Sequence, residues 1–180
     1  MQKKELRAYI RELKRQYSHE QLKAMSSAIT NRAIDFIHNY DKKDGCKTIL
    51  LYHSLPDEVY THSLISSLSD KGYTVLLPTV IDNENMELHI YINDEEYHVG
   101  AMNIQEANGD AFDCYEKIDL AIIPGMAFTK DGRRLGRGKG YYDRILQKIK
   151  CPLIGLAFPF QIVDNIPCEE HDVKMNYIIS

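Results

Sequence analysis

Hydrophobic residues near the start of the chain recur every three or four positions among charged ones. This spacing over residues 3–16 predicts an amphipathic helix. A second helix is expected from Ser18, because Ser18 and Gln21 form the Ser-x-x-Gln pattern of a capping box. Apolar positions at helical spacing continue to Tyr40, and Gly45 is expected to end this helical part of the chain.

Beyond Gly45 the apolar residues instead form short continuous runs close to Pro or Gly, a pattern typical of buried parallel strands. These runs occupy residues 47–52, 74–78, 118–123 and 153–158. Helical spacing returns between them, over residues 59–69 and 141–149. Alternating strands and helices predict a three-layer α/β fold, an open, mostly parallel Rossmann-like sheet with helices on both faces.

Three further segments complete the prediction. Residues 86–92 and 177–179 are expected to add strands, whereas the acidic, weakly periodic residues 93–117 are expected to be loop with short elements. A chain of 180 residues without internal repeat, low-complexity tract or linker fits one domain, so residues 1–180 are expected to form a single unit.

Composition narrows the class of protein. The chain has 44% hydrophobic residues, enough for a core, and its four cysteines form no C-x-x-C and are expected to be reduced thiols. Its histidines lack the spacings of a zinc site. No run of about 18 apolar residues is present, and the amino-terminal segment is charged and amphipathic, so a cytoplasmic protein is expected.

The charge of the chain is unevenly distributed. Its net charge of −4 disfavours general binding to nucleic acid or to anionic membranes. Residues 130–139, however, contain five basic side chains and one acidic side chain. This short stretch is therefore the candidate to meet an anion.

The basic stretch belongs to a glycine-rich segment, residues 124–144, between a predicted buried strand and a predicted helix. Gly136, Gly138 and Gly140 permit positive φ and close backbone approach, while N–H groups at a helix start favour oxyanions. Arg137 and Lys139 would add positive charge. The residues indicate a phosphate-type anion site, with a solvated surface loop as the open alternative; neither a Walker A motif nor G-x-G-x-x-G is present.

The segment Arg-Leu-Gly-Arg-Gly-Lys-Gly-Tyr-Tyr-Asp, residues 134–143, resembles the signature of the 5-formyltetrahydrofolate cyclo-ligase family, the methenyltetrahydrofolate synthetases. Residues 3–7 (Lys-Lys-Glu-Leu-Arg) resemble the family's nucleotide-contacting motif, and residues 56–58 (Pro-Asp-Glu) its substrate-contacting turn. Residues 161–172 resemble its carboxy-terminal motif. The resemblance thus covers nearly the whole chain in the expected order.

The sequence departs from the family pattern at three positions. Thr129 stands where an acidic residue is expected, Ala107 where a proline would follow Glu106, and Asn176 where a second aspartate is expected. None of these removes a residue with a primary role. Asn176 does weaken the idea that two carboxylates of the terminal motif share a metal ion.

The resemblance implies that ATP and Mg²⁺ drive the closure of 5-formyltetrahydrofolate to 5,10-methenyltetrahydrofolate, with release of ADP and phosphate. Phosphorylation of the formyl oxygen would let N10 attack the formyl carbon and phosphate leave. Such a reaction depends mainly on positioning and charge stabilisation. The implied partners are these two small molecules, with no nucleic acid, membrane or protein partner.

The resemblance also implies roles for individual residues. Arg137 and Lys139 are the expected catalytic residues. ATP is expected to contact Lys3, Lys4, Arg7, Arg134, Leu135, Gly136, Arg137, Gly138, Lys139, Gly140, Tyr141 and Tyr142. The folate substrate is expected to contact His53, Glu58, Arg137, Gly138, Lys139, Gly140 and Tyr141. Mg²⁺ is expected at Asp143 and Asp172, because carboxylate oxygens suit this ion.

Several of these residues have plainer interpretations. Lys3 and Arg7 could form a solvated helix face, Tyr141 and Tyr142 could pack at a helix start, and Asp143 could complement the helix dipole. Two other functions also stay open: a different ATP- or phosphometabolite-using enzyme on the same scaffold, and a module that grips nucleic-acid phosphate. The narrow basic stretch and the absence of tryptophan disfavour the second.

Overall fold

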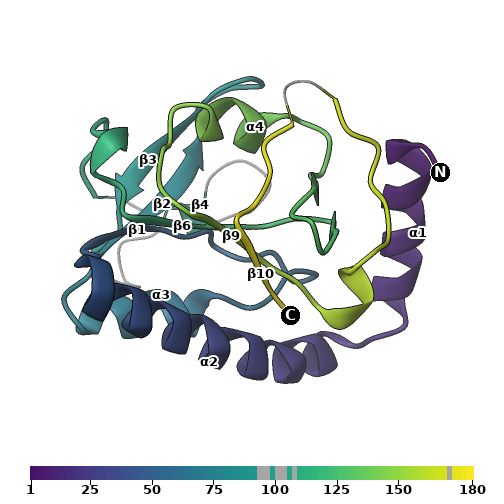
Figure 1. The fold of residues 1–180 in the computed structure, drawn as a ribbon, viewed down its shortest axis with the longest axis horizontal. Helices are drawn as coiled ribbons and strands as arrows, with labels where there is room; N and C mark the ends of the chain where they lie inside the picture. The colour runs from purple at the N-terminus through teal and green to yellow at the C-terminus, as the bar shows by residue number, and fades with distance from the viewer. Residues whose placement is uncertain (93–97, 100–104, 107–108, 170–171) are drawn as a thin grey trace.

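The computed structural model describes residues 1–92, 98–99, 105–106, 109–169 and 172–180. A six-stranded sheet in the order β10-β9-β6-β1-β2-β3 lies at its centre (Figure 1). The strands are β1 (Thr48–Leu50), β2 (Thr74–Val80), β3 (Met86–Ile90), β6 (Leu120–Ile123), β9 (Leu153–Leu156) and β10 (Tyr177–Ile179). All neighbours pair in parallel except β2 and β3, which confirms the predicted mostly parallel sheet.

The helices are α1 (Lys3–Arg15), α2 (His19–Asp44), α3 (His62–Asp70) and α4 (Tyr141–Leu146), with two short 3₁₀ turns, η3 (Tyr115–Lys117) and η4 (Pro159–Gln161). The start of α2 confirms the capping box: the Ser18 hydroxyl accepts from the Gln21 amide at 3.2 Å, and the Gln21 side chain accepts from the Ser18 amide at 2.7 Å. Gly45 ends α2 with a φ of +71°, a left-handed conformation that glycine adopts readily.

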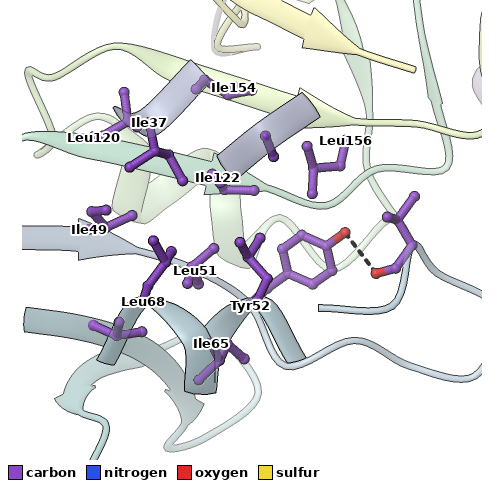
Figure 2. Close-up of a cluster of buried hydrophobic side chains, with 14 of the residues drawn as sticks. Ile37, Ile49, Leu51, Tyr52, Ile65, Leu68, Leu120, Ile122, Ile154 and Leu156 are labelled. Atoms are coloured by element: carbon purple, nitrogen blue, oxygen red, sulfur yellow. Dashed lines mark hydrogen bonds between the residues drawn. The ribbon is translucent and has the colours of Figure 1, made fainter. Parts of the chain in front are cut away.

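The sheet is covered on both faces, as predicted. Helices α2 and α3 pack on one face and α4 on the other (Figure 1). Because successive side chains of a strand point to opposite faces, Ile49 packs toward α2 and α3 whereas Leu50 packs toward the α4 side. Burial on both faces explains why this strand is apolar at successive positions. Figure 2 shows the larger core, where Tyr52 donates a hydrogen bond to the Val59 carbonyl.

Helix α1 lies away from the sheet faces, at one end of the molecule beside the carboxy-terminal segment (Figure 1). Its buried Leu6 and Ile10 pack with Met126, Leu135 and Ile166. Leu135 belongs to a small hairpin of β7 (Ala127–Phe128) and β8 (Arg134–Leu135), inside the glycine-rich segment 124–144, for which no strand was predicted. Two-residue strands carry too little alternation to be recognised in a sequence.

Other boundaries differ by a few residues. Helix α3 begins at His62 rather than 59, since Thr61 is buried and bonded to the Tyr52 carbonyl. Within 93–117, β4 (His98–Val99) pairs with β5 (Gln105–Glu106); residues 93–97, 100–104 and 107–108, including Ala107, lie outside the described part. No helix in the described ranges is long and apolar enough to cross a membrane.

Candidate active site

The sheet has one point where its connections change direction. From β1 the chain runs to β2 and β3 on one side, and it returns through β6 on the other side of β1. Ligands of open α/β sheets bind at such a crevice, beyond the carboxyl ends of the strands. Tyr52 and His53 follow β1, Pro124 and Gly125 follow β6, and all four line one pocket of about 930 Å³ that includes its open mouth.

Three walls enclose this pocket. The glycine loop, residues 136–140, and the first turn of α4 form one wall; Leu55 and Glu58 form a second. The third is apolar and comes from the β2–β3 hairpin, with Pro78, Val80 and Met86. Sequence reasoning missed this third wall, because apolar residues on a strand look the same whether they face a core or a ligand.

Helix α1 reaches the glycine loop through Arg7. The Arg7 Nε donates a hydrogen bond of 2.8 Å to the Gly136 carbonyl. A Cβ on Gly138 would lie 3.4 Å from Arg7 Cζ, so the guanidinium rests against the Gly138 backbone. Of the three loop glycines that permit positive φ, Gly138 and Gly140 have it, at +106° and +73°, whereas Gly136 does not. The two predicted phosphate-binding segments therefore lie together.

Lys3, about one helical turn before Arg7, forms an ion pair with Asp172. The Lys3 ammonium lies 2.7 and 3.0 Å from the two Asp172 oxygens and 3.3 Å from Glu169. Burial lowers the pKa of Lys3, but the two carboxylates outweigh this effect and raise it. Lys3, Asp172 and the exposed Lys4 are not among the described residues that line the pocket.

Arg134 is buried beneath the glycine loop. Its side chain is 3% exposed, and it donates to Asp143 Oδ1 at 2.5 Å and to the Pro124 carbonyl at 3.2 Å. The guanidinium carbon lies 5.7 Å from the centre of the Tyr142 ring, a cation–π distance. The neighbouring Leu135 side chain packs in the α1 cluster, away from the pocket.

Arg137 projects toward the substrate turn predicted from residues 56–58. Its Nε donates to Glu58 Oε1 at 2.9 Å, and its Nη2 donates to Asp57 Oδ1 at 2.5 Å. The other Asp57 oxygen lies 3.0 Å from the Nζ of Lys14. Burial raises the pKa of Asp57, but Lys14 and Arg137 outweigh this effect and lower it.

Sequence reasoning missed Lys14, although a signal was available. Lys14 follows Leu6 and Ile10 at intervals of four residues, so it shares their buried helix face. A lysine in such a position needs a partner for its charge, and burial indeed lowers its pKa.

Tyr141 and Arg144 connect the start of α4 to the turn of the β2–β3 hairpin. The Tyr141 hydroxyl donates to the Asp82 carbonyl at 2.9 Å, and Arg144 Nε donates to the Glu84 carbonyl at 2.6 Å. His53, which follows β1, has its ring centre 3.7 Å from that of His62. Tyr141 and His53 both line the pocket, so both can contact a ligand there.

The two predicted metal ligands do not share one site. Asp143 lines the pocket and uses Oδ1 for Arg134, while both Asp172 oxygens bond to Lys3. In the described ranges no three His, Cys, Asp or Glu side chains are grouped to hold a metal. Mg²⁺ is often held by one or two carboxylates together with substrate phosphates, so Asp143 fits this ion and Asp172, as placed here, does not.

The arrangement combines a glycine-rich loop, arginine side chains and an adjacent apolar wall with a carboxylate in one pocket. Compared with known protein families, residues 1–180 match the model of the 5-formyltetrahydrofolate cyclo-ligase family over their whole length. The chain belongs to this family. It is a 5-formyltetrahydrofolate cyclo-ligase, a folate enzyme of one-carbon metabolism, and its family membership implies that it uses ATP.

Individual relatives of the cyclo-ligase agree with this assignment. The 5-formyltetrahydrofolate cyclo-ligase of Mus musculus is 32% identical over 98% of this chain and 92% of its own length. The enzyme of Escherichia coli K12 is 29% identical over 95% and 96% of the two chains. The solved structure of Aquifex aeolicus 5,10-methenyltetrahydrofolate synthetase superposes with a TM-score of 0.81, at 29% identity over 99% of this chain and 89% of that one.

Proposed function

We propose that the pocket at the carboxyl ends of β1 and β6 holds the terminal phosphate of ATP against the N5-formyl oxygen of 5-formyltetrahydrofolate. The observation that carries this proposal is the 2.9 Å contact between Arg137 and Glu58. One residue belongs to the predicted phosphate loop and the other to the predicted substrate turn. Their contact supports the proposal that the two substrates meet at this point.

The reaction then proceeds in two steps without an enzyme nucleophile. The formyl oxygen attacks the γ-phosphorus, an O–P bond forms, and the bond to the bridging oxygen breaks to release ADP. N10 next attacks the formyl carbon, and the C–O bond breaks as phosphate leaves with the formyl oxygen and the N10 proton is lost. A formyl oxygen is a poor leaving group until it carries phosphate, so the first step activates the second.

The residues of the glycine loop supply the charge stabilisation. Arg137 and Lys139 act on the transferring phosphoryl group, where negative charge is redistributed in the transition state. The backbone of Gly136, Gly138 and Gly140 approaches the phosphates closely, and Arg7 lies against the same loop. Lys3 and Lys4 extend this basic edge along α1.

Buried Arg134 acts on the shape of the glycine loop. With 3% of its side chain exposed, it holds Asp143 and Pro124 and thereby shapes the loop from beneath. Asp143 holds Mg²⁺ together with the ATP phosphates, and the ion neutralises phosphate charge when bound. Asp172 fixes the position of Lys3.

The folate lies between the substrate turn and the apolar wall. The Glu58 carboxylate accepts hydrogen bonds from the N–H groups of the pterin, and Tyr141 and His53 border the same space.

Residues 1–180 act as one domain. The enzyme works in the cytoplasm, consistent with four cysteines that form no disulfide, although a relative from Arabidopsis thaliana is named as mitochondrial.

An isotope experiment tests the order of bond changes. The purified enzyme is given 5-formyltetrahydrofolate with ¹⁸O in the formyl group, together with ATP and Mg²⁺. We expect the methenyl chromophore to appear as ¹⁸O enters inorganic phosphate. Release of the label into water instead would contradict phosphorylation of the formyl oxygen.

A further inference from the structure

Four charged side chains form a continuous ion-pair network from α1 to the glycine loop. Lys14 Nζ lies 3.0 Å from Asp57 Oδ2, and Arg137 contacts Asp57 at 2.5 Å and Glu58 at 2.9 Å. Two positive and two negative groups balance each other. The network begins at a buried residue of α1 and ends in the pocket.

Lys14 is the inner end of this chain and is only 4% exposed. It occupies the helix face on which Leu6 and Ile10 are apolar. A buried ion pair contributes little net stability, because removal of both charges from water offsets their attraction. Stability alone is therefore a weak reason for a lysine at this position, and an effect on the pocket is a stronger one.

Asp57 links Lys14 to Arg137, because its two carboxylate oxygens bond to different cations. One oxygen faces Lys14 and the other faces Arg137. When Arg137 turns to the transferring phosphate, Asp57 loses this partner but keeps Lys14. Without Lys14 the same movement would leave a half-buried carboxylate unpaired, and Asp57 would retain Arg137.

We propose that Lys14 is a positioning residue for ring closure, which compensates Asp57 so that Arg137 is free to act on phosphate. The inference rests on the proposed function of Arg137. Lys14 itself touches neither substrate. Its contribution is to lower the cost of transferring Arg137 from protein carboxylate to substrate phosphate.

Turnover measurements on Lys14→Met test this proposal, since methionine keeps the apolar stem and removes the charge. We expect kcat to fall about 10-fold, in the range seen when a residue that orients a site residue is lost. The KM for 5-formyltetrahydrofolate should change less than twofold, because Glu58 keeps its place. Arg11→Met, on the exposed side of the same helix, is the matched control and should leave both constants unchanged.

The decisive comparison is the double variant Lys14→Met/Asp57→Asn. A neutral side chain at position 57 needs no compensating lysine. The kcat of the double variant should therefore recover to within about threefold of the wild-type value. A purely structural role for Lys14 predicts that the folded single variant already has the wild-type kcat and that Asp57→Asn restores only its thermal stability. If Lys14→Met does not fold, Lys14→Gln is compared with its own Asp57→Asn double variant in the same way.

Two results would overturn the proposal: an unchanged kcat in Lys14→Met, or a double variant as slow as the single one. Arg137→Met separates this inference from the proposed function. If Arg137→Met is slow while Lys14→Met is not, only the role of Lys14 is wrong. If Arg137→Met keeps the wild-type kcat, the role proposed for Arg137 is wrong and that of Lys14 with it.

Discussion

Arg7 Nε donates a 2.8 Å hydrogen bond to the carbonyl of Gly136, which lies 129 positions further along the chain. The bond joins the first helix to the glycine loop at the point where both are proposed to meet ATP. The acceptor is a backbone oxygen, in a loop where most residues are glycine and offer no side chain to bond. Arg7 thus supports the shape of the loop as well as its charge.

Arg7→Lys should weaken ATP binding although the charge is kept. Lysine has no planar Nε–H group to reach the Gly136 carbonyl while its end group faces phosphate. Without this bond ATP has to restore the shape of the loop when it binds. A hydrogen bond from a charged group is worth about 1.5–3 kcal/mol, so the Kd for ATP should rise by no more than roughly 10- to 150-fold. Calorimetry measures this directly, with the exposed Arg11→Lys as control; equal affinities for both variants would contradict the assignment.

Gly138→Ala should impair ATP binding without any change of charge. Its φ of +106° strains an alanine, and the new methyl group would lie 3.4 Å from Arg7 Cζ. Gly45→Ala is the control, because Gly45 also has positive φ, at +71°, but nothing lies within 4 Å of the added Cβ. We expect both variants to lose about 1 kcal/mol of stability and only Gly138→Ala to lose ATP affinity.

Lys139→Ala should lower kcat by about 10²–10³, the usual effect of removing one electrostatic group from a site where charge develops. Lys139 is exposed and lines the pocket, so the fold should not change. Lys130→Ala removes an exposed lysine outside the pocket lining and should leave turnover unaltered. Equal activity of the two variants would place the phosphoryl group elsewhere.

Asp143→Asn should have two separable effects. Turnover should require a higher Mg²⁺ concentration, because an anionic ligand is lost. Thermal unfolding should also show a loss of about 1–3 kcal/mol, since the buried Arg134 loses its charged partner. Asp172→Asn should remove the carboxylate that holds the Lys3 ammonium in place, without altering the Mg²⁺ dependence. Unaltered Mg²⁺ dependence in Asp143→Asn would leave that residue a structural role only.

Glu58→Gln should separate folate binding from ATP binding. A carboxylate that accepts from pterin N–H groups contributes about 1.5–3 kcal/mol, so the KM for 5-formyltetrahydrofolate should rise about 10- to 150-fold. ATP affinity measured without folate should hardly fall, because the variant also releases Arg137 from a competing carboxylate. A loss of ATP affinity with constant folate KM would move Glu58 to the nucleotide side.

Local patterns predicted much of this fold. The capping box at Ser18 and the apolar runs that became β1, β2, β6 and β9 involve residues close together in the chain, so their spacing is visible in the sequence. The β7–β8 hairpin was missed because each strand has only two residues. The packing of α1 away from both faces of the sheet was not predicted, because it depends on apolar partners more than a hundred residues away.

The candidate site was predicted less evenly. Glycines with positive φ and the meeting of Arg7 with the glycine loop followed from motifs. The contacts of Arg137 with Asp57 and Glu58 join residues about eighty positions apart, and no local spacing indicates them. Asp143 and Asp172, both expected to bind Mg²⁺, pair with different basic residues, Arg134 and Lys3, and these pairings join segments too far apart in the chain to be seen in the sequence.

The location of α1 has a consequence for the order in which a newly made chain can fold. The ribosome produces α1 first, but its apolar partners Met126, Leu135 and Ile166 come from the later part of the chain. An isolated helix of 13 residues is marginal in water, so α1 has no stable place until these residues have been made. Strands β1, β2, β3 and β6 can pair earlier, whereas the side of the enzyme proposed to bind ATP is completed late in synthesis.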